Sequence, residues 1–142
     1  MDATDYKILE LLQKNARISM KSIGQKVGLT APAVSDRIKK MEKNDIILGY
    51  KAVVNVEKLG KKVRALVEIS MNAQKRKEFC DLVEEEPSII ECYHVTGPCC
   101  MIAKCLCEDM KELDALIDRI QEYGETNTLL VLSVPLKKQT IL

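Results

Sequence analysis

The first 44 residues carry apolar side chains at intervals of three and four, a spacing that predicts three short helices. Each predicted helix has a residue placed to cap its N-terminus: Thr4 and Asp5 for the first, Ser19 for the second and Thr30 for the third. The apolar positions that we expect on the inner faces of these helices are Ile8, Leu9, Leu11, Leu12, Ile23, Val27, Val34, Ile38 and Met41.

The turn Gly28-Leu29-Thr30 joins the second and third predicted helices and predicts a helix-turn-helix. Gly28 can adopt the left-handed conformation that often ends a helix, and Pro32 falls in a first turn, where a missing N–H is tolerated. The outward face of the third helix has short polar side chains near its N-terminus and cations further along. A helix that enters the major groove needs this combination, because small groups approach base edges while cations neutralise phosphates.

Residues 46–54, Ile-Ile-Leu-Gly-Tyr-Lys-Ala-Val-Val, contain two short apolar runs around Gly49. This pattern predicts a β-ribbon wing, with Lys51 placed to contact the DNA backbone. The third helix should contribute phosphate or guanine contacts through its cations, and its N-terminal amides with the Thr30 hydroxyl should hold a phosphate. The residues that we predict to contact DNA are Ser22, Thr30, Pro32, Ala33, Ser35, Asp36, Arg37, Lys39, Lys40 and Lys51.

Beyond a polar linker at residues 55–62, the pattern predicts a second domain with the order βαββαβ. The first strand is typical: Val63, Ala65, Val67, Ile69 and Met71 lie on one face. This order is the ferredoxin-like arrangement, in which both helices cover one face of an antiparallel sheet. The expected strands are 63–71, 89–95, 100–107 and 126–135, and the expected helices are 74–86 and 109–123.

The fold class is therefore expected to be α+β, with a winged helix-turn-helix domain at residues 1–54 and a ferredoxin-like domain at residues 63–142. The chain has no further segment to cover the second face of the predicted sheet. Leu66 and the apolar run 129–132 lie where that face is expected, so we predict that a second copy of the chain covers it in a homodimer.

The composition divides along the same boundary. The 142 residues include 22 Lys and Arg against 21 Asp and Glu, a balance that excludes a uniformly basic coat. Residues 1–60 carry a net charge of +4 and residues 61–142 a net charge of −3, which favours a nucleic-acid partner for the first part alone. The apolar runs are shorter than the ~18–20 residues that a membrane span needs, and the polar start is not a signal peptide. We expect a cytoplasmic protein without a membrane partner.

All six cysteines lie between Cys80 and Cys107. Cys99-Cys100 and Cys105-x-Cys107 have spacings that rarely suit a disulfide, so we expect reduced thiols that pack as small apolar groups. A metal or redox site built from Cys92, His94 and the later cysteines is the alternative. The absence of a Cys-x-x-Cys pair disfavours it, and we predict no metal and no cofactor.

Four stretches of the N-terminal part have a specific spacing: Asp5-x-Lys-Ile-Leu-x-x-Leu-Gln-Lys-Asn-Ala-Arg-Ile-Ser, Gly28-Leu-Thr, Arg37-Ile-x-x-Met-Glu and Ile46-Ile-x-Gly-Tyr. With the predicted two-domain layout, they resemble the Lrp/AsnC family of bacterial and archaeal feast/famine regulators over nearly the whole chain. The resemblance implies a transcriptional regulator that binds specific sequences of double-stranded DNA. It also implies a RAM- or ACT-like second domain, dimers that assemble to tetramers or octamers, and a small effector, commonly an amino acid, between dimers.

The hairpin after the second strand departs from the family pattern. The family usually has Gly-Asp-Tyr/Phe-Asp there, whereas this chain has Gly97-Pro98-Cys99-Cys100 and lacks both carboxylates that would accept from an ammonium group. The hairpin resembles an LrpC-like subgroup, which implies a DNA-organising regulator without a firm amino-acid effector. Two interpretations of the effector pocket therefore remain: that it is altered, and that it still binds an effector. The candidate effector contacts are His94, Thr96, Gly97, Cys99, Cys100, Thr126 and Thr128.

An enzyme is the remaining alternative, because siroheme decarboxylases resemble the same two-domain layout. A tetrapyrrole pocket would need basic and histidine side chains, and His94 is the one histidine in the sequence. The sequence shows neither a paired acid and base nor an activated nucleophile. We therefore expect a regulator and not an enzyme.

Overall fold

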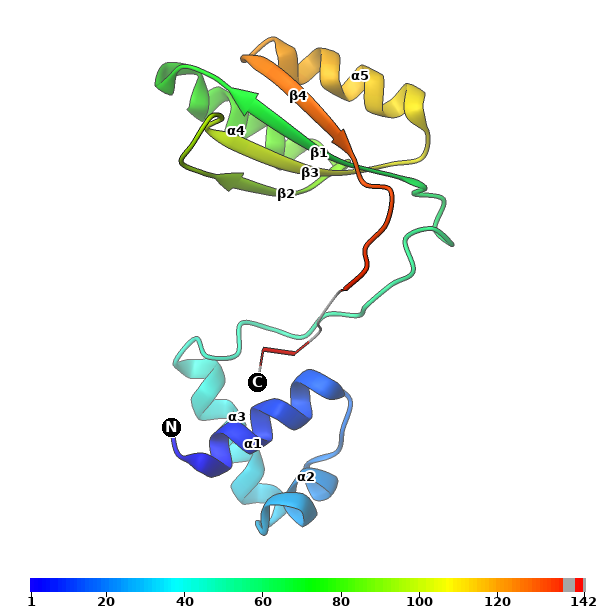
Figure 1. The fold of residues 1–142 in the computed structure, drawn as a ribbon. Helices are drawn as coiled ribbons and strands as arrows, with labels where there is room; N and C mark the ends of the chain where they lie inside the picture. Colours follow the sequence, from blue (N-terminus) through cyan, green and yellow to red (C-terminus); the bar gives the residue numbers. More distant parts are fainter. Residues whose placement is uncertain (137–139, 142) are drawn as a thin grey trace. The chain divides into compact units, whose positions relative to one another are not determined.

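The computed structural model describes residues 1–136 and 140–141. Two compact units make up the chain: Met1–Val53 with Leu136–Leu142, and Val54–Pro135 (Figure 1). The expected domain limits stay predictions, and residues 137–139 and 142 of the expected second domain lie outside the described residues. In the described part of the chain, none of the helices is both long enough and apolar enough to cross a bilayer.

Three helices form the first unit: α1 (Ala3–Lys14), α2 (Met20–Val27) and α3 (Ala31–Lys43). Their apolar stripes meet in one core, as the spacing predicted. Leu11 and Val27 are partly buried and pack against this core. Its buried members are Ile8, Leu9, Leu12, Ile23, Val34, Ile38 and Met41.

Side-chain caps begin α2 and α3 where the sequence predicted them. The Ser19 hydroxyl accepts from the backbone N–H of Ser22 at 3.1 Å, and the Thr30 hydroxyl accepts from that of Ala33 at 3.4 Å. Gly28 ends α2 with φ of +72°, in the left-handed region.

The start of α1 differs from the prediction. Asp2, not Thr4 or Asp5, is the N-cap. The Asp2 carboxylate accepts from the Asp5 N–H, and the Asp5 carboxylate accepts from the Asp2 N–H, both at 2.9 Å. This capping box satisfies two backbone donors at once, which explains why the helix begins earlier than a single cap suggested.

The predicted β-ribbon wing is wrong: the described structure contains no strand in residues 46–54. The backbone N–H groups of Ile46 and Ile47 both donate to the Met41 carbonyl, at 2.9 and 3.3 Å. This turn closes the end of α3 and packs Ile47 against the core, so the first apolar run is not available for strand pairing. Lys51 is exposed but does not lie on a ribbon.

The second unit has the predicted ferredoxin-like order. The strands are β1 (Val63–Ser70), β2 (Ile89–His94), β3 (Met101–Cys107) and β4 (Glu125–Leu130). A short 3₁₀ turn (Ala73–Lys75) leads into α4 (Arg76–Glu85), and α5 (Met110–Gln121) connects β3 to β4. The strands pair antiparallel in the order β2-β3-β1-β4. The last strand is shorter than predicted, because its register with β1 ends at the pair Ala65 and Leu130.

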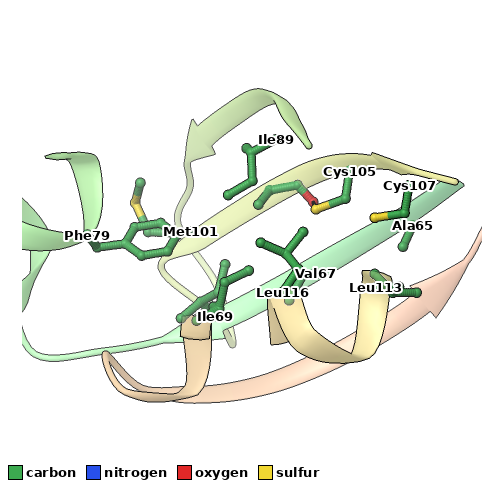
Figure 2. Close-up of a cluster of buried hydrophobic side chains, with 12 residues drawn as sticks. Ala65, Val67, Ile69, Phe79, Ile89, Met101, Cys105, Cys107, Leu113 and Leu116 are labelled. Carbon is green, nitrogen blue, oxygen red and sulfur yellow. Dashed lines mark hydrogen bonds between the residues drawn. The ribbon is translucent and has the colours of Figure 1, made fainter. Parts of the chain in front are cut away.

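Both helices cover the same face of the sheet (Figure 1). The core beneath them includes the Cys105 and Cys107 side chains, which confirms their role as small apolar groups (Figure 2). Phe79 of α4 meets Tyr123 edge to face, with 5.7 Å between the ring centroids. The other residues fully or largely buried here are Ala65, Val67, Ile69, Ile89, Met101, Ala103, Leu113, Leu116 and Ile120.

Within the described residues of the second unit, the opposite face of the sheet has no helix over it (Figure 1). Leu66 of β1 is directly opposite Leu129 of β4, and Tyr93 of β2 is opposite Ile102 of β3. Tyr93 and Leu129 are 49% and 45% exposed. We call Leu66, Tyr93, Ile102 and Leu129 the open apolar face.

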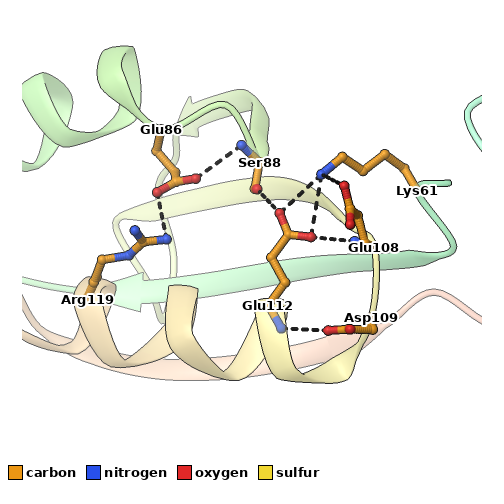
Figure 3. Close-up of polar contacts among 7 residues, drawn as sticks. All are labelled: Lys61, Glu86, Ser88, Glu108, Asp109, Glu112 and Arg119. Atoms are coloured by element: carbon orange, nitrogen blue, oxygen red, sulfur yellow. Dashed lines mark hydrogen bonds and ion pairs between the residues drawn. The ribbon is translucent and has the colours of Figure 1, made fainter. Parts of the chain in front are cut away.

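A polar cluster joins the segment between α4 and β2, helix α5 with the residues just before it, and the segment before β1 (Figure 3). The Ser88 hydroxyl donates to the Glu112 carboxylate at 2.6 Å, and the Lys61 ammonium donates to the same carboxylate at 3.1 Å. The Glu108 backbone N–H donates to it as well. Together, first the Glu108 amide and then Ser88 and Lys61 lower the pKa of Glu112 to about 2.

Candidate nucleic-acid interface and effector cavity

The outward face of α3 is basic. Val34, Ile38 and Met41 point into the core. Since successive residues turn by roughly 100° in a helix, the opposite side carries Pro32, Asp36, Lys39 and Lys43, with Lys40 beside them. These five residues are all exposed.

Three lysines of this face stand free for an anionic partner. Among the residues that the structure describes, no ion pair is formed by Lys39, Lys40 or Lys43. Exposed ammonium groups in a row along one helix are suited to neutralising phosphates. The sequence prediction missed Lys43, although its position four residues after Lys39 places it on the same face.

Arg37 has a different environment from these lysines. Its Nη1 atom lies 2.7 Å from Asp2 Oδ2 and 2.7 Å from Asp5 Oδ1, so the guanidinium is directed at the start of α1. Arg37 is on the flank of α3, between the core and the outward face. The contact of Arg37 with DNA stays a prediction.

The remaining predicted DNA contacts lie in the first turn of α2, at the start and along the sides of α3, and in the segment that follows α3. The Ser22 hydroxyl shares a 2.8 Å hydrogen bond with that of the N-cap Ser19. The Thr30 hydroxyl is itself the N-cap of α3 and accepts from the Ala33 N–H. Ala33 and Ser35 are half-buried on the sides of α3. Contacts of Ser22, Thr30, Ala33, Ser35 and Lys51 with DNA stay predictions.

Gly24 allows the backbone of α2 to approach the turn that leads into α3. The sequence prediction missed this residue. Its carbonyl accepts from the Leu29 N–H at 3.0 Å. A Cβ atom at this position would lie 2.4 Å from the Leu29 carbonyl oxygen. The backbones of α2 and of the segment entering α3 therefore approach each other as closely as a glycine permits.

A cavity of about 190 Å³ lies beside the β2–β3 hairpin in the second unit. Of the predicted effector contacts, Cys99 and Thr126 line it, and the other five do not. Cys100 instead accepts from the Met71 N–H at 3.4 Å, and Thr128 is opposite Val67 on the side of the sheet that the helices cover. His94, Thr96 and Gly97 are exposed in and before the hairpin turn.

Strands β1 and β4 supply polar groups to this cavity that the sequence prediction missed: Glu68, Ser70, Glu125 and Asn127. The Asn127 amide donates to the Glu68 carboxylate at 2.7 Å. The strand register is the signal that identifies them, because it places Glu68 opposite Asn127 and Ser70 opposite Glu125. Carboxylates can accept from an ammonium group, so this cavity has acceptors even though the hairpin has lost its own.

The cysteines have little nucleophilic character where they are buried. All six are free thiols. Burial raises the pKa of Cys105 to about 12 and also raises the pKa of Cys92 and Cys107, which keeps these thiols protonated. Among the described residues, no group of three or more His, Cys, Asp or Glu is arranged to hold a metal ion.

Two family descriptions match this chain: an AsnC-type helix-turn-helix domain at residues 1–42 and a Lrp/AsnC ligand binding domain at residues 64–141. The HTH-type transcriptional regulator LrpB of Bacillus subtilis is 38% identical over 134 residues, which span 94% of this chain and 89% of LrpB. LrpC of the same organism is 30% identical over 94% of this chain and 92% of its own length.

Solved structures share the fold. The structure of Bacillus subtilis LrpC has a TM-score of 0.91 at 30% identity and covers 97% of this chain and 99% of that one. A transcriptional regulator of Neisseria meningitidis in complex with L-Met has a TM-score of 0.92, covering 100% of this chain and 96% of that one. Its sequence identity is 24%, so this likeness concerns the fold alone.

Proposed function

This chain belongs to the Lrp/AsnC family of transcriptional regulators, and from that premise we propose that α3 enters the major groove of double-stranded DNA. The observation that carries the proposal is the row of exposed lysines on the outward face of α3, Lys39, Lys40 and Lys43, none of them paired within the described structure. Pro32 and Asp36 lie on the same face, toward the N-terminus of the helix, where side chains approach the bases.

Salt dependence of binding tests this assignment. Each phosphate contact that is lost reduces the slope of log K against log salt by about 0.9. The variant with Lys39, Lys40 and Lys43 all changed to Gln should therefore bind DNA more weakly and with a markedly smaller slope. The matched control changes Lys62, Lys77 and Lys111, three exposed lysines of the second unit, to Gln. Equal slopes for the two variants would contradict the proposal.

The homodimer is the second part of the proposed function. The open apolar face supports it, because Tyr93 and Leu129 expose large side chains over a sheet whose other face is fully packed. A second copy that covers this face would bring two helix-turn-helix units to one DNA site, and further contacts between dimers would give tetramers or octamers.

An amino-acid effector is the third part. The Neisseria meningitidis structure of the same fold is a complex with L-Met. In this chain the cavity beside the hairpin has Glu68 and Glu125 as acceptors for an α-ammonium group, with Cys99 and Thr126 beside them. The ammonium group would therefore be bound by carboxylates of the strands and not by carboxylates of the hairpin.

Regulation of transcription is the activity that fits these features, and we place it in the cytoplasm. The relatives that cover nearly the whole chain are named as transcriptional regulators. A thiol-based sensor gains no support from the core cysteines, because burial raises the pKa of Cys105 to about 12 and keeps this thiol protonated.

A further inference from the structure

Arg37 connects the recognition helix to the first turn of α1. One nitrogen, Nη1, donates to both Asp2 and Asp5 at 2.7 Å, across more than 30 positions of sequence. The side chains are 15% exposed for Asp5, 34% for Arg37 and 54% for Asp2, so the contact to Asp5 is partly shielded from water. Shielding and the use of two carboxylates distinguish it from an ordinary surface ion pair.

The two carboxylates divide their oxygens in the same way. Asp2 uses Oδ1 for the Asp5 N–H and Oδ2 for Arg37. Asp5 uses Oδ2 for the Asp2 N–H and Oδ1 for Arg37. The capping box of α1 and the contact to α3 are therefore one hydrogen-bonded unit, which we call the Arg37 clamp. These bonds hold the pKa of both carboxyls below the ordinary value, so the clamp stays ionised at neutral pH.

The clamp lies where the apolar core does not reach. The buried side chains of α1 begin at Ile8, so the first turn of this helix adds nothing to the core. At the other end of the contact, Arg37 immediately follows Asp36 and precedes Lys39 by two residues. A change in how α3 lies against the start of α1 would move these groups relative to the DNA.

We propose that Arg37 is a positioning residue for DNA binding and not a DNA contact: through Asp2 and Asp5 it fixes α3 against α1 and so sets the placement of Lys39 and Lys40. The proposal rests on the proposed function. It makes the two acids necessary for binding a polyanion, although acids near DNA ordinarily weaken binding by repulsion.

The sign of the Asp5→Asn effect tests the clamp in the full-length protein. The probe is a labelled duplex that the wild-type chain selects from a random-sequence pool. Asp5→Asn should weaken binding by about three- to tenfold, even though it removes a negative charge. Glu10→Gln is the matched control, because Glu10 is on the same helix and, among the described residues, its one ion pair is with Lys14. It should bind as tightly as wild type or slightly more tightly.

Arg37→Gln separates positioning from contact. It should weaken binding by a similar factor and leave the salt slope unchanged, whereas loss of a phosphate contact lowers that slope by about 0.9. The double variant Asp5→Asn with Arg37→Gln should lose no more affinity than the weaker-binding single variant, because both remove the same clamp.

Either of two results overturns the clamp: Asp5→Asn that binds as tightly as Glu10→Gln, or Arg37→Gln with a slope reduced by about 0.9. Circular dichroism checks that each variant keeps its helices. Should Asp5→Asn fail to fold, Asp2→Asn takes its place, because asparagine is as good an N-cap as aspartate. A wild-type chain that selects no duplex would refute the proposed function itself, while a binding wild type with a tight Asp5→Asn variant would refute the clamp alone.

Discussion

The carboxylate of Glu86 lies 2.7 Å from Nη2 of Arg119. The Glu86 side chain is only 8% exposed, and its charge is balanced by the Arg119 side chain, which is half exposed. The second carboxylate oxygen accepts from the Ser88 N–H at 3.2 Å (Figure 3). Both interactions stabilise the folded state, because a buried carboxylate without partners loses its hydration energy and no other interaction offsets that loss.

Removing the cation should therefore destabilise the second unit. We expect Arg119→Ala to lower the free energy of unfolding by about 1–3 kcal/mol, measured by urea denaturation. Lys111→Ala, at an exposed position of the same helix, is the control and should change stability little. An Arg119→Ala variant as stable as this control would show that Glu86 does not depend on its partner.

Acid should weaken the second unit through Glu112. Its pKa in the folded chain is about 2, below the ordinary value of 4.5, so the folded state holds the proton more weakly than the unfolded one. The resulting stability is fully present above pH 4.5 and is lost as the pH falls toward 2. The thermal midpoint should fall over this window, and Glu112→Gln should flatten the fall. Glu78→Gln, at an exposed position of α4, should keep the wild-type profile; the same flattening there would argue against Glu112 as the source.

Substituting Gly24 should disrupt the helix-turn-helix. An alanine Cβ would lie 2.4 Å from the Leu29 carbonyl oxygen, which is backbone and cannot move without opening the turn. We expect Gly24→Ala to cost about 1–3 kcal/mol of unfolding free energy and to weaken DNA binding. Gln25→Ala, exposed on the same helix, should leave both unchanged. A Gly24→Ala variant with wild-type stability would mean that the turn relaxes easily.

Local features of this fold could be predicted from the sequence, and features that depend on distant residues could not. Ser19 and Thr30 are caps because each bonds a backbone N–H three residues later. The contact of Arg37 with Asp2 and Asp5 could not be predicted, because these partners are more than 30 residues away along the chain. The wing prediction was wrong for a similar reason, because the backbone N–H groups of Ile46 and Ile47 donate to the carbonyl of Met41, which belongs to α3. Glu68 and Glu125 reach the cavity beside the hairpin through strand register, which the hydrophobic pattern alone does not give.

A charge in the open apolar face should separate the proposed dimer. Leu66 lies on a central strand opposite Leu129, so Leu66→Glu would bury a carboxylate if a second copy covers this face. We expect a monomer by light scattering and weaker DNA binding. Met110→Glu, an exposed position at the start of α5, is the control and should keep the wild-type mass. An unchanged mass for Leu66→Glu would place the interface elsewhere.

Amino acids should stabilise the protein if the cavity beside the hairpin binds their α-ammonium group. A ligand at about 100 times its Kd adds about 2.7 kcal/mol of stability, which a thermal-shift screen of the twenty amino acids detects. The shift should disappear in Glu125→Gln and persist in Asp114→Asn, an exposed acid of α5. It should also disappear for the N-acetyl derivative of the active amino acid, because the acetyl group removes the ammonium charge that Glu68 and Glu125 would accept. A derivative that still stabilises the protein would show that the ligand is held by other groups, and a screen without any shift would contradict the amino-acid effector.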